Sequence, residues 1–107
     1  MFFKLFKKNK TNDNNKSYKD KILEKRDKNV EIEKKRIKKE LGWKLEHMVK
    51  DGYICSSLNP SLDYLNVYSL NTYLKELEEL EEYDGIYFKT YEYVNETMIE
   101  IGIKREN

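Results

Sequence analysis

The sequence contains no alanine and no glutamine, and its 107 residues include one cysteine, one proline and four glycines. A lone cysteine excludes an internal disulfide, so we expect a protein of the reducing cytoplasm. No apolar run approaches the ~20 residues that span a bilayer. The chain also begins without the apolar stretch and small-residue cleavage site of a secretory signal peptide. Lys, Asn, Ile and Tyr are abundant instead, which is typical of AT-rich coding sequences.

Positive and negative charges lie in opposite halves of the chain. Residues 1–50 contain 17 Lys+Arg against 8 Asp+Glu, a net +9, whereas residues 51–107 contain 4 against 12, a net −8. The total of +1 is therefore a cancellation. Such a chain is expected to present a cationic surface to an anionic partner and to keep an acidic surface elsewhere.

The chain is long enough for one domain, which we place at residues 29–107. Residues 1–28 are predicted to be a basic, largely flexible segment, with an Asn- and Lys-rich linker at 9–20 and a marginal helix at 21–28. Residues 1–8 form a short amphipathic pattern suited to reversible contact with an anionic membrane surface. Packing on the domain, packing on a second copy, and a frayed terminus are the alternatives. The apolar residues of this start are Phe2, Phe3, Leu5 and Phe6.

The clearest periodic segment predicts a helix over residues 30–51. Asn29 is a suitable N-cap and Gly52 a suitable C-cap. The apolar stripe of this helix consists of Val30, Ile37, Leu41, Leu45, Met48 and Val49. Ile32 and Trp43 lie on the opposite side, where the N-terminal segment or a second copy would cover them. Alternatively, Trp43 is half exposed along lysine stems.

The acidic half predicts short elements that complete an α+β domain. A strand is expected at 53–57, and the Asn59-Pro60 pair favours a helical turn at 60–66, with a strand at 62–68 as the competing interpretation. A second helix is expected at 69–83. Alternation then predicts a C-terminal β-hairpin of strands 86–93 and 97–104, joined by a turn at 94–96.

The run Leu74-Lys75-Glu76-Leu77-Glu78-Glu79-Leu80, followed directly by the hairpin, resembles a winged helix-turn-helix domain. The resemblance covers residues 30–104 through the order of elements, and it implies DNA binding with the hairpin as the wing. Two features depart from that family. No turn glycine lies between Pro60 and Leu74, and the helix in the recognition position is acidic. Glutamates near phosphates are unfavourable, so this helix is not expected to enter the major groove.

Contact with nucleic acid is therefore expected from cations elsewhere. The run 34–39 is the strongest candidate because it has five cations in six positions; a solvated helix face is the alternative interpretation. The predicted nucleic-acid-binding residues are Lys25, Arg26, Lys34, Lys35, Arg36, Lys38, Lys39, Lys89, Lys104 and Arg105. Residues predicted to contact a protein partner are Trp43, Glu76, Glu79 and Glu82.

Catalytic residues are not evident. His47 is the only histidine, Cys55 has no independent base to activate it, and the glutamates have helix-surface spacing. None of the short nucleotide-binding or metal-binding motifs is present, so we expect neither an enzyme nor a cofactor or metal.

The sequence favours a small DNA-binding accessory protein of a plasmid or phage from a low-GC bacterium, contacting DNA through its basic N-terminal half and the wing. The alternative is a non-enzymatic interaction module, an inhibitor or adaptor that docks through its acidic helix. A membrane-surface scaffold and a homodimer are further hypotheses.

Overall fold

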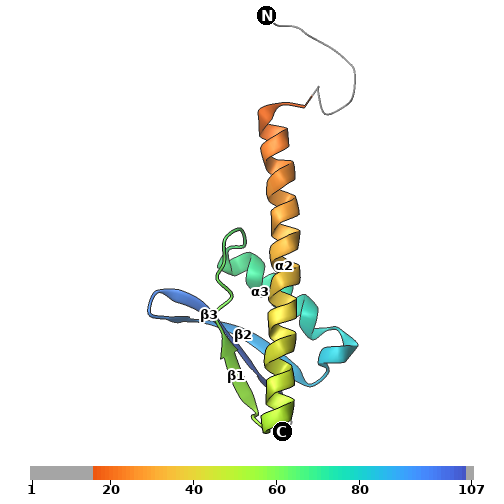
Figure 1. The fold of residues 1–107 in the computed structure, drawn as a ribbon, viewed down its shortest axis with the longest axis vertical. Coiled ribbons are helices and arrows are strands. Elements are labelled where there is room, and N and C mark those ends of the chain that lie inside the picture. The colour runs from red at the N-terminus through yellow and green to blue at the C-terminus, as the bar shows by residue number, and fades with distance from the viewer. Residues whose placement is uncertain (1–15, 106–107) are drawn as a thin grey trace, which may run out of the picture.

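The computed structural model describes residues 16–105. Its longest element is helix α2, Tyr18–Asp51, whose 34 residues span about 51 Å at ~1.5 Å per residue. Ser17 caps its start, because the hydroxyl accepts a 3.2 Å hydrogen bond from the Asp20 amide. Gly52 ends it in the left-handed conformation (φ 76°), and its amide donates to the Met48 carbonyl over 2.8 Å. Figure 1 shows the first turns of α2 extending beyond the rest of the domain.

The predicted start of this helix was wrong. The helix begins at Tyr18, so Asn29 is an internal residue, and residues 18–28 belong to a continuous helix instead of a linker and a separate marginal one. Residues 18–29 contain no proline or glycine, and four Lys, one Leu, one Glu and one Arg among them have good helix propensity. The capping residue Ser17 therefore sets the start. The amphipathic pattern at 1–8 and the linker residues 9–15 lie outside the described residues.

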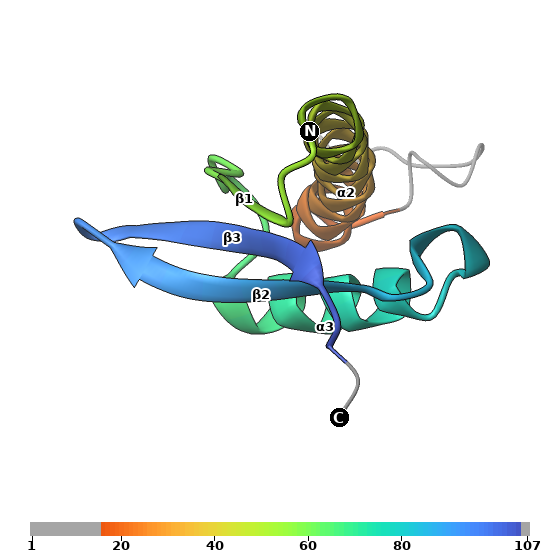
Figure 2. The same ribbon diagram turned by 90° about the horizontal axis from the view of Figure 1, so that it is seen from below.

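Three antiparallel strands form a sheet of order β1-β3-β2: β1 is Cys55–Leu58, β2 is Ile86–Tyr93 and β3 is Glu96–Ile103. The predicted hairpin is confirmed. Its turn places Val94 and Asn95 at positive φ (49° and 64°), as a two-residue turn between twisted strands requires. The first strand begins two residues later than predicted. Figure 2, which looks along α2, shows the hairpin lying across α3.

Helix α3, Val67–Glu78, corresponds to the second predicted helix, and a short 3₁₀ turn at Glu81–Tyr83 follows it. Asn66 caps α3 through a 2.7 Å hydrogen bond from the Ser69 amide. The helical turn predicted at 60–66 was wrong, and so was the alternative strand at 62–68. The segment between β1 and α3 is a loop, in which the Asn59 side chain accepts from the Ser61 amide over 2.9 Å.

The core lies where α2, α3 and one face of the sheet meet, which confirms the α+β class. Its fully buried aliphatic side chains include Ile37, Leu41, Leu70, Leu74, Ile99 and Ile101. Val49, predicted to belong to the stripe, is 80% exposed. It falls ~100° from the centre of the stripe on a helical wheel, which turns it away from the sheet. No helix within residues 16–105 has both the length and the apolar character needed to cross a membrane.

Candidate nucleic-acid interface

A buried carboxylate fixes the loop before α3 to the middle of α2. Glu33 is only 4% exposed. Its Oε1 accepts from the amide of Asp63 (2.9 Å), its Oε2 accepts from that of Leu65 (2.8 Å), and both oxygens accept from Tyr64 (3.2 and 3.1 Å). In a helix at 60–66 the amides of residues 63–65 would donate to carbonyls four residues earlier, whereas here one side chain accepts from all three. This explains why the segment is an ordered loop.

Three of the cations predicted to bind nucleic acid form ion pairs within the protein. Arg36 lies 3.8 Å from Glu33, pairs with Glu40 at 3.1 Å and donates to the Ser61 carbonyl at 3.1 Å. Lys34 pairs with Glu31 at 3.4 Å, and Lys38 pairs with a glutamate beyond α3. Because these side chains are already paired, the run 34–39 has fewer unpaired cations with which to bind an external anion.

The other side of α2 carries a row of lysines, which we call the cationic stripe. On a helical wheel these lysines fall within ~80° of one another, opposite the buried face. All are exposed, and within residues 16–105 none lies within ion-pair distance of a carboxylate. The row covers about 27 Å of the helix at ~1.5 Å per residue. The cationic stripe consists of Lys21, Lys25, Lys28, Lys35 and Lys39.

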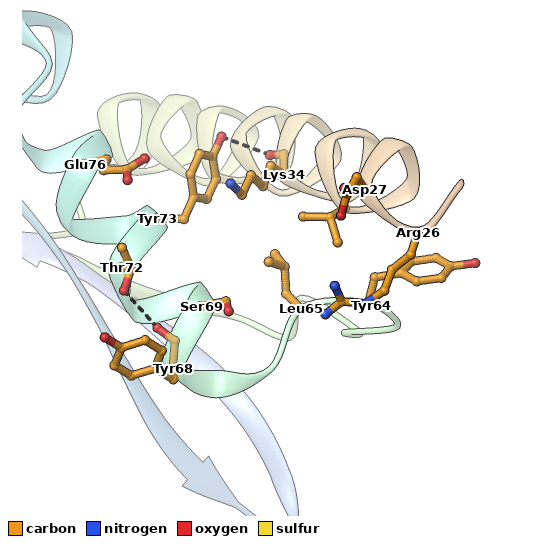
Figure 3. Close-up of a pocket in the computed structure, with 11 residues that line it drawn as sticks. Arg26, Asp27, Lys34, Tyr64, Leu65, Tyr68, Ser69, Thr72, Tyr73 and Glu76 are labelled. Atoms are coloured by element: carbon orange, nitrogen blue, oxygen red, sulfur yellow. Dashed lines mark hydrogen bonds between the residues drawn. The ribbon is translucent and has the colours of Figure 1, made fainter. Parts of the chain in front are cut away.

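Two members of the stripe, Lys21 and Lys28, were not among the predicted residues. The signal that could have found them is the alternating spacing of four and three residues, which keeps side chains on one helix face. It was obscured because the helix was expected to begin near residue 30. Lys25, Lys35 and Lys39 were predicted and lie on the stripe, whereas Arg26 points toward Tyr64 in the loop before α3 (Figure 3).

Two exposed apolar side chains interrupt the stripe. Ile32 is 64% exposed and Trp43 is 57% exposed. The Lys39 ammonium lies 5.4 Å from the centre of the Trp43 ring, a cation–π distance, as expected for a half-exposed Trp beside lysine stems.

The cations of the wing do not form a comparable patch. Lys104 pairs with Glu78 at 3.6 Å. Lys89 is exposed but stands opposite Glu100 in the strand register. Arg105 borders a separate hollow beside β1 and Tyr87.

The acidic residues remain apart from the stripe. Glu76 is exposed on α3, and Glu79 is exposed at the C-cap of this helix. Glu78 accepts a 2.8 Å hydrogen bond from the Phe88 amide, so this carboxylate joins α3 to β2. Among the described residues, a single ion pair joins α2 to the acidic segment 76–84, that of Lys38 and Glu82 at 3.3 Å. The lysines of the stripe and the carboxylates of residues 76–84 are therefore separated in the folded structure as well as in the sequence.

A hollow of about 290 Å³ lies between α2 and α3 on the side away from the stripe (Figure 3). Arg26 and Tyr64 border it at one end, and Tyr73 and Glu76 border it at the other. The Tyr73 hydroxyl donates to the Lys34 carbonyl at 3.1 Å, and burial raises the pKa of this phenol, with the nearby carboxylates of Glu31 and Glu76 adding to the shift.

The residues with catalytic potential are scattered. His47 lies with its Nδ1 3.0 Å from the Trp43 carbonyl, and Cys55 is exposed at the start of β1. No group of three or more His, Cys, Asp or Glu within residues 16–105 is arranged to hold a metal ion. Comparisons of the chain with family models, curated proteins and solved structures found no match.

Proposed function

We propose that the protein binds nucleic acid, with α2 lying along the phosphate backbone and the cationic stripe facing it. The observation that carries this proposal is the row of five exposed lysines, none of which lies within ion-pair distance of a carboxylate among the described residues, although Lys28 interacts electrostatically with Glu24 at longer range. Lysines neutralise phosphates as point charges and release counterions, which supplies affinity largely independent of sequence. This function fits the cytoplasmic location expected from the lone cysteine.

The spacing of the stripe favours a polyanion over a second copy of the chain. Steps of four and three residues are those of a coiled-coil seam, where apolar side chains normally lie. Here lysines occupy most of these positions and Ile32 is the aliphatic exception. Two identical seams would place like charges face to face, whereas a phosphate backbone would neutralise them.

The acidic helix α3 stays away from the phosphates in this arrangement. Glu76 and Glu79 would repel them at close range, so the recognition-helix contact implied by the winged-helix resemblance is replaced by contact along α2. We therefore propose an accessory protein that recognises backbone more than base sequence.

The number of contacts sets the expected salt dependence. If three or four lysines of the stripe neutralise phosphates, log K falls with log salt with a slope of about −2.7 to −3.6. Raising the salt from 50 to 200 mM then weakens binding about 40- to 150-fold.

Fluorescence anisotropy with a labelled duplex tests the proposal. The stripe variant carries Lys25→Gln, Lys35→Gln and Lys39→Gln. Each phosphate contact contributes ~0.9 to log K for every tenfold fall in salt below 1 M. At 0.1 M salt, loss of three contacts is therefore expected to weaken binding by up to about 500-fold. The matched control removes the same charge from the wing: Lys89→Gln, Lys104→Gln and Arg105→Gln. Loss of affinity in the wing variant alone would contradict the stripe and favour winged-helix contact. No binding by the wild-type protein at low salt would refute nucleic-acid binding altogether.

A further inference from the structure

We infer that the hollow between α2 and α3 takes an unpaired nucleobase, so that the substrate class is single-stranded or locally unpaired nucleic acid. This inference rests on the function proposed above and adds to it a site for the base, on the far side of α2 from the lysines.

The hollow is connected to the stripe around the first turns of α2. A second, shallower hollow of about 380 Å³ is bordered by Lys21 and Lys25, which belong to the stripe. It shares Arg26 and Tyr64 with the hollow of Figure 3. A strand whose phosphates contact the stripe can therefore pass over Arg26 and reach the space between the helices.

Two tyrosines with exposed rings line the hollow: Tyr64 lies beside Arg26 where a base would arrive, and Tyr68 lies on the first turn of α3 with its ring turned outward (Figure 3). Tyr64 is 46% exposed and Tyr68 is 81% exposed. Within residues 16–105 neither hydroxyl makes a hydrogen bond, unlike that of Tyr73. Exposed rings beside a cation are the combination on which unpaired bases stack, because every base has an aromatic face. In a duplex both faces of each base are already stacked.

The charges at the rim select the base over the phosphate. Arg26 lies at the entrance and suits a phosphate or a stacked base. The lining also includes Asp27, which lies near Arg26, and Glu76 at the opposite end (Figure 3). Carboxylates repel phosphate but accept hydrogen bonds from the exocyclic amino groups of bases. The hollow therefore suits a neutral, planar, amino-bearing group attached to an anionic chain.

Anisotropy with a 15-nucleotide cytidine strand and a 15-base-pair duplex tests the inference. Replacing Tyr64 and Tyr68 by Ser is expected to weaken single-strand binding by about 5- to 150-fold for each base whose stacking is lost. Duplex binding and the salt slope should stay unchanged. Tyr93→Ser is the matched control, because this ring is 64% exposed at the far end of the hairpin.

The outcomes separate this inference from the proposed function. Single-strand binding that is equal in the wild-type protein and the double tyrosine variant, together with a loss in the stripe variant, overturns the base site and keeps the stripe. A wild-type protein that binds only duplex also overturns the base site. If neither nucleic acid is bound, the proposed function fails first. Circular dichroism of each variant should match the wild type, since both rings are exposed.

Discussion

The change Glu33→Gln tests how strongly one buried carboxylate holds the loop before α3. The substitution keeps the shape of the side chain but replaces one oxygen by an amino group. The remaining oxygen still accepts from backbone amides, while the new NH₂ group faces an amide that is itself a donor, at worst the buried Leu65 amide. Hydrogen bonds to charged groups contribute about 1.5–3 kcal/mol each, and the remaining oxygen keeps the other contacts. We therefore expect a loss of about 2–3 kcal/mol in the free energy of unfolding.

Thermal unfolding followed by circular dichroism measures this loss. For a domain of this size, 2–3 kcal/mol corresponds to a fall in Tm of about 10–20 °C. Glu31→Gln is the matched control, because it removes the same charge from the same helix at a side chain that is 65% exposed. Its exposed pair with Lys34 is worth about 0–1 kcal/mol. If the two variants unfold at the same temperature, the reasoning about Glu33 is refuted.

Further predictions concern glycine and tyrosine positions. Gly42→Ala should stabilise α2 by about 0.5–1 kcal/mol, since a methyl group there meets open space. Gly102→Ala should destabilise by about 1–3 kcal/mol, because the new methyl would overlap the Tyr87 ring; equal Tm values for the two variants would contradict this. The raised pKa of Tyr73, whose ordinary value is 10.0, implies stability that is complete below about pH 10 and is lost as pH rises through the raised pKa. Tyr73→Phe should make the free energy of unfolding fall less steeply with pH above pH 10. Urea unfolding at several pH values measures this, and the same pH dependence in the variant and the wild type would contradict the prediction.

Periodic segments were predictable from the sequence because local patterns specify them. The hairpin follows from the isoleucines at every second position of β3, of which Ile99 and Ile101 are buried and Ile103 is exposed at the end of the strand. The body of α2 follows from its apolar stripe. Both patterns reflect burial of one face. The start of α2 was missed because residues 18–28 pack against little, so helix propensity and the Ser17 cap decide there.

Contacts distant in sequence were not predictable in the same way. Glu33 looked like one more exposed glutamate in a charged helix, yet it binds amides about thirty residues away. That pairing also explains why Asn59-Pro60, a typical helix start, begins a loop. Within the run 34–39 the sequence could not show that Lys38 is paired, because its carboxylate partner, Glu82, lies on another element.

The salt dependence of nucleic-acid binding, compared between the wild-type protein and the stripe variant, tests the central claim most directly. The account predicts a slope of log K against log salt near −3 for the wild type, and a slope closer to zero by about 0.9 for each contacting lysine replaced. An unchanged slope in the stripe variant, with affinity intact, would show that the lysines on the outer face of α2 do not contact phosphate.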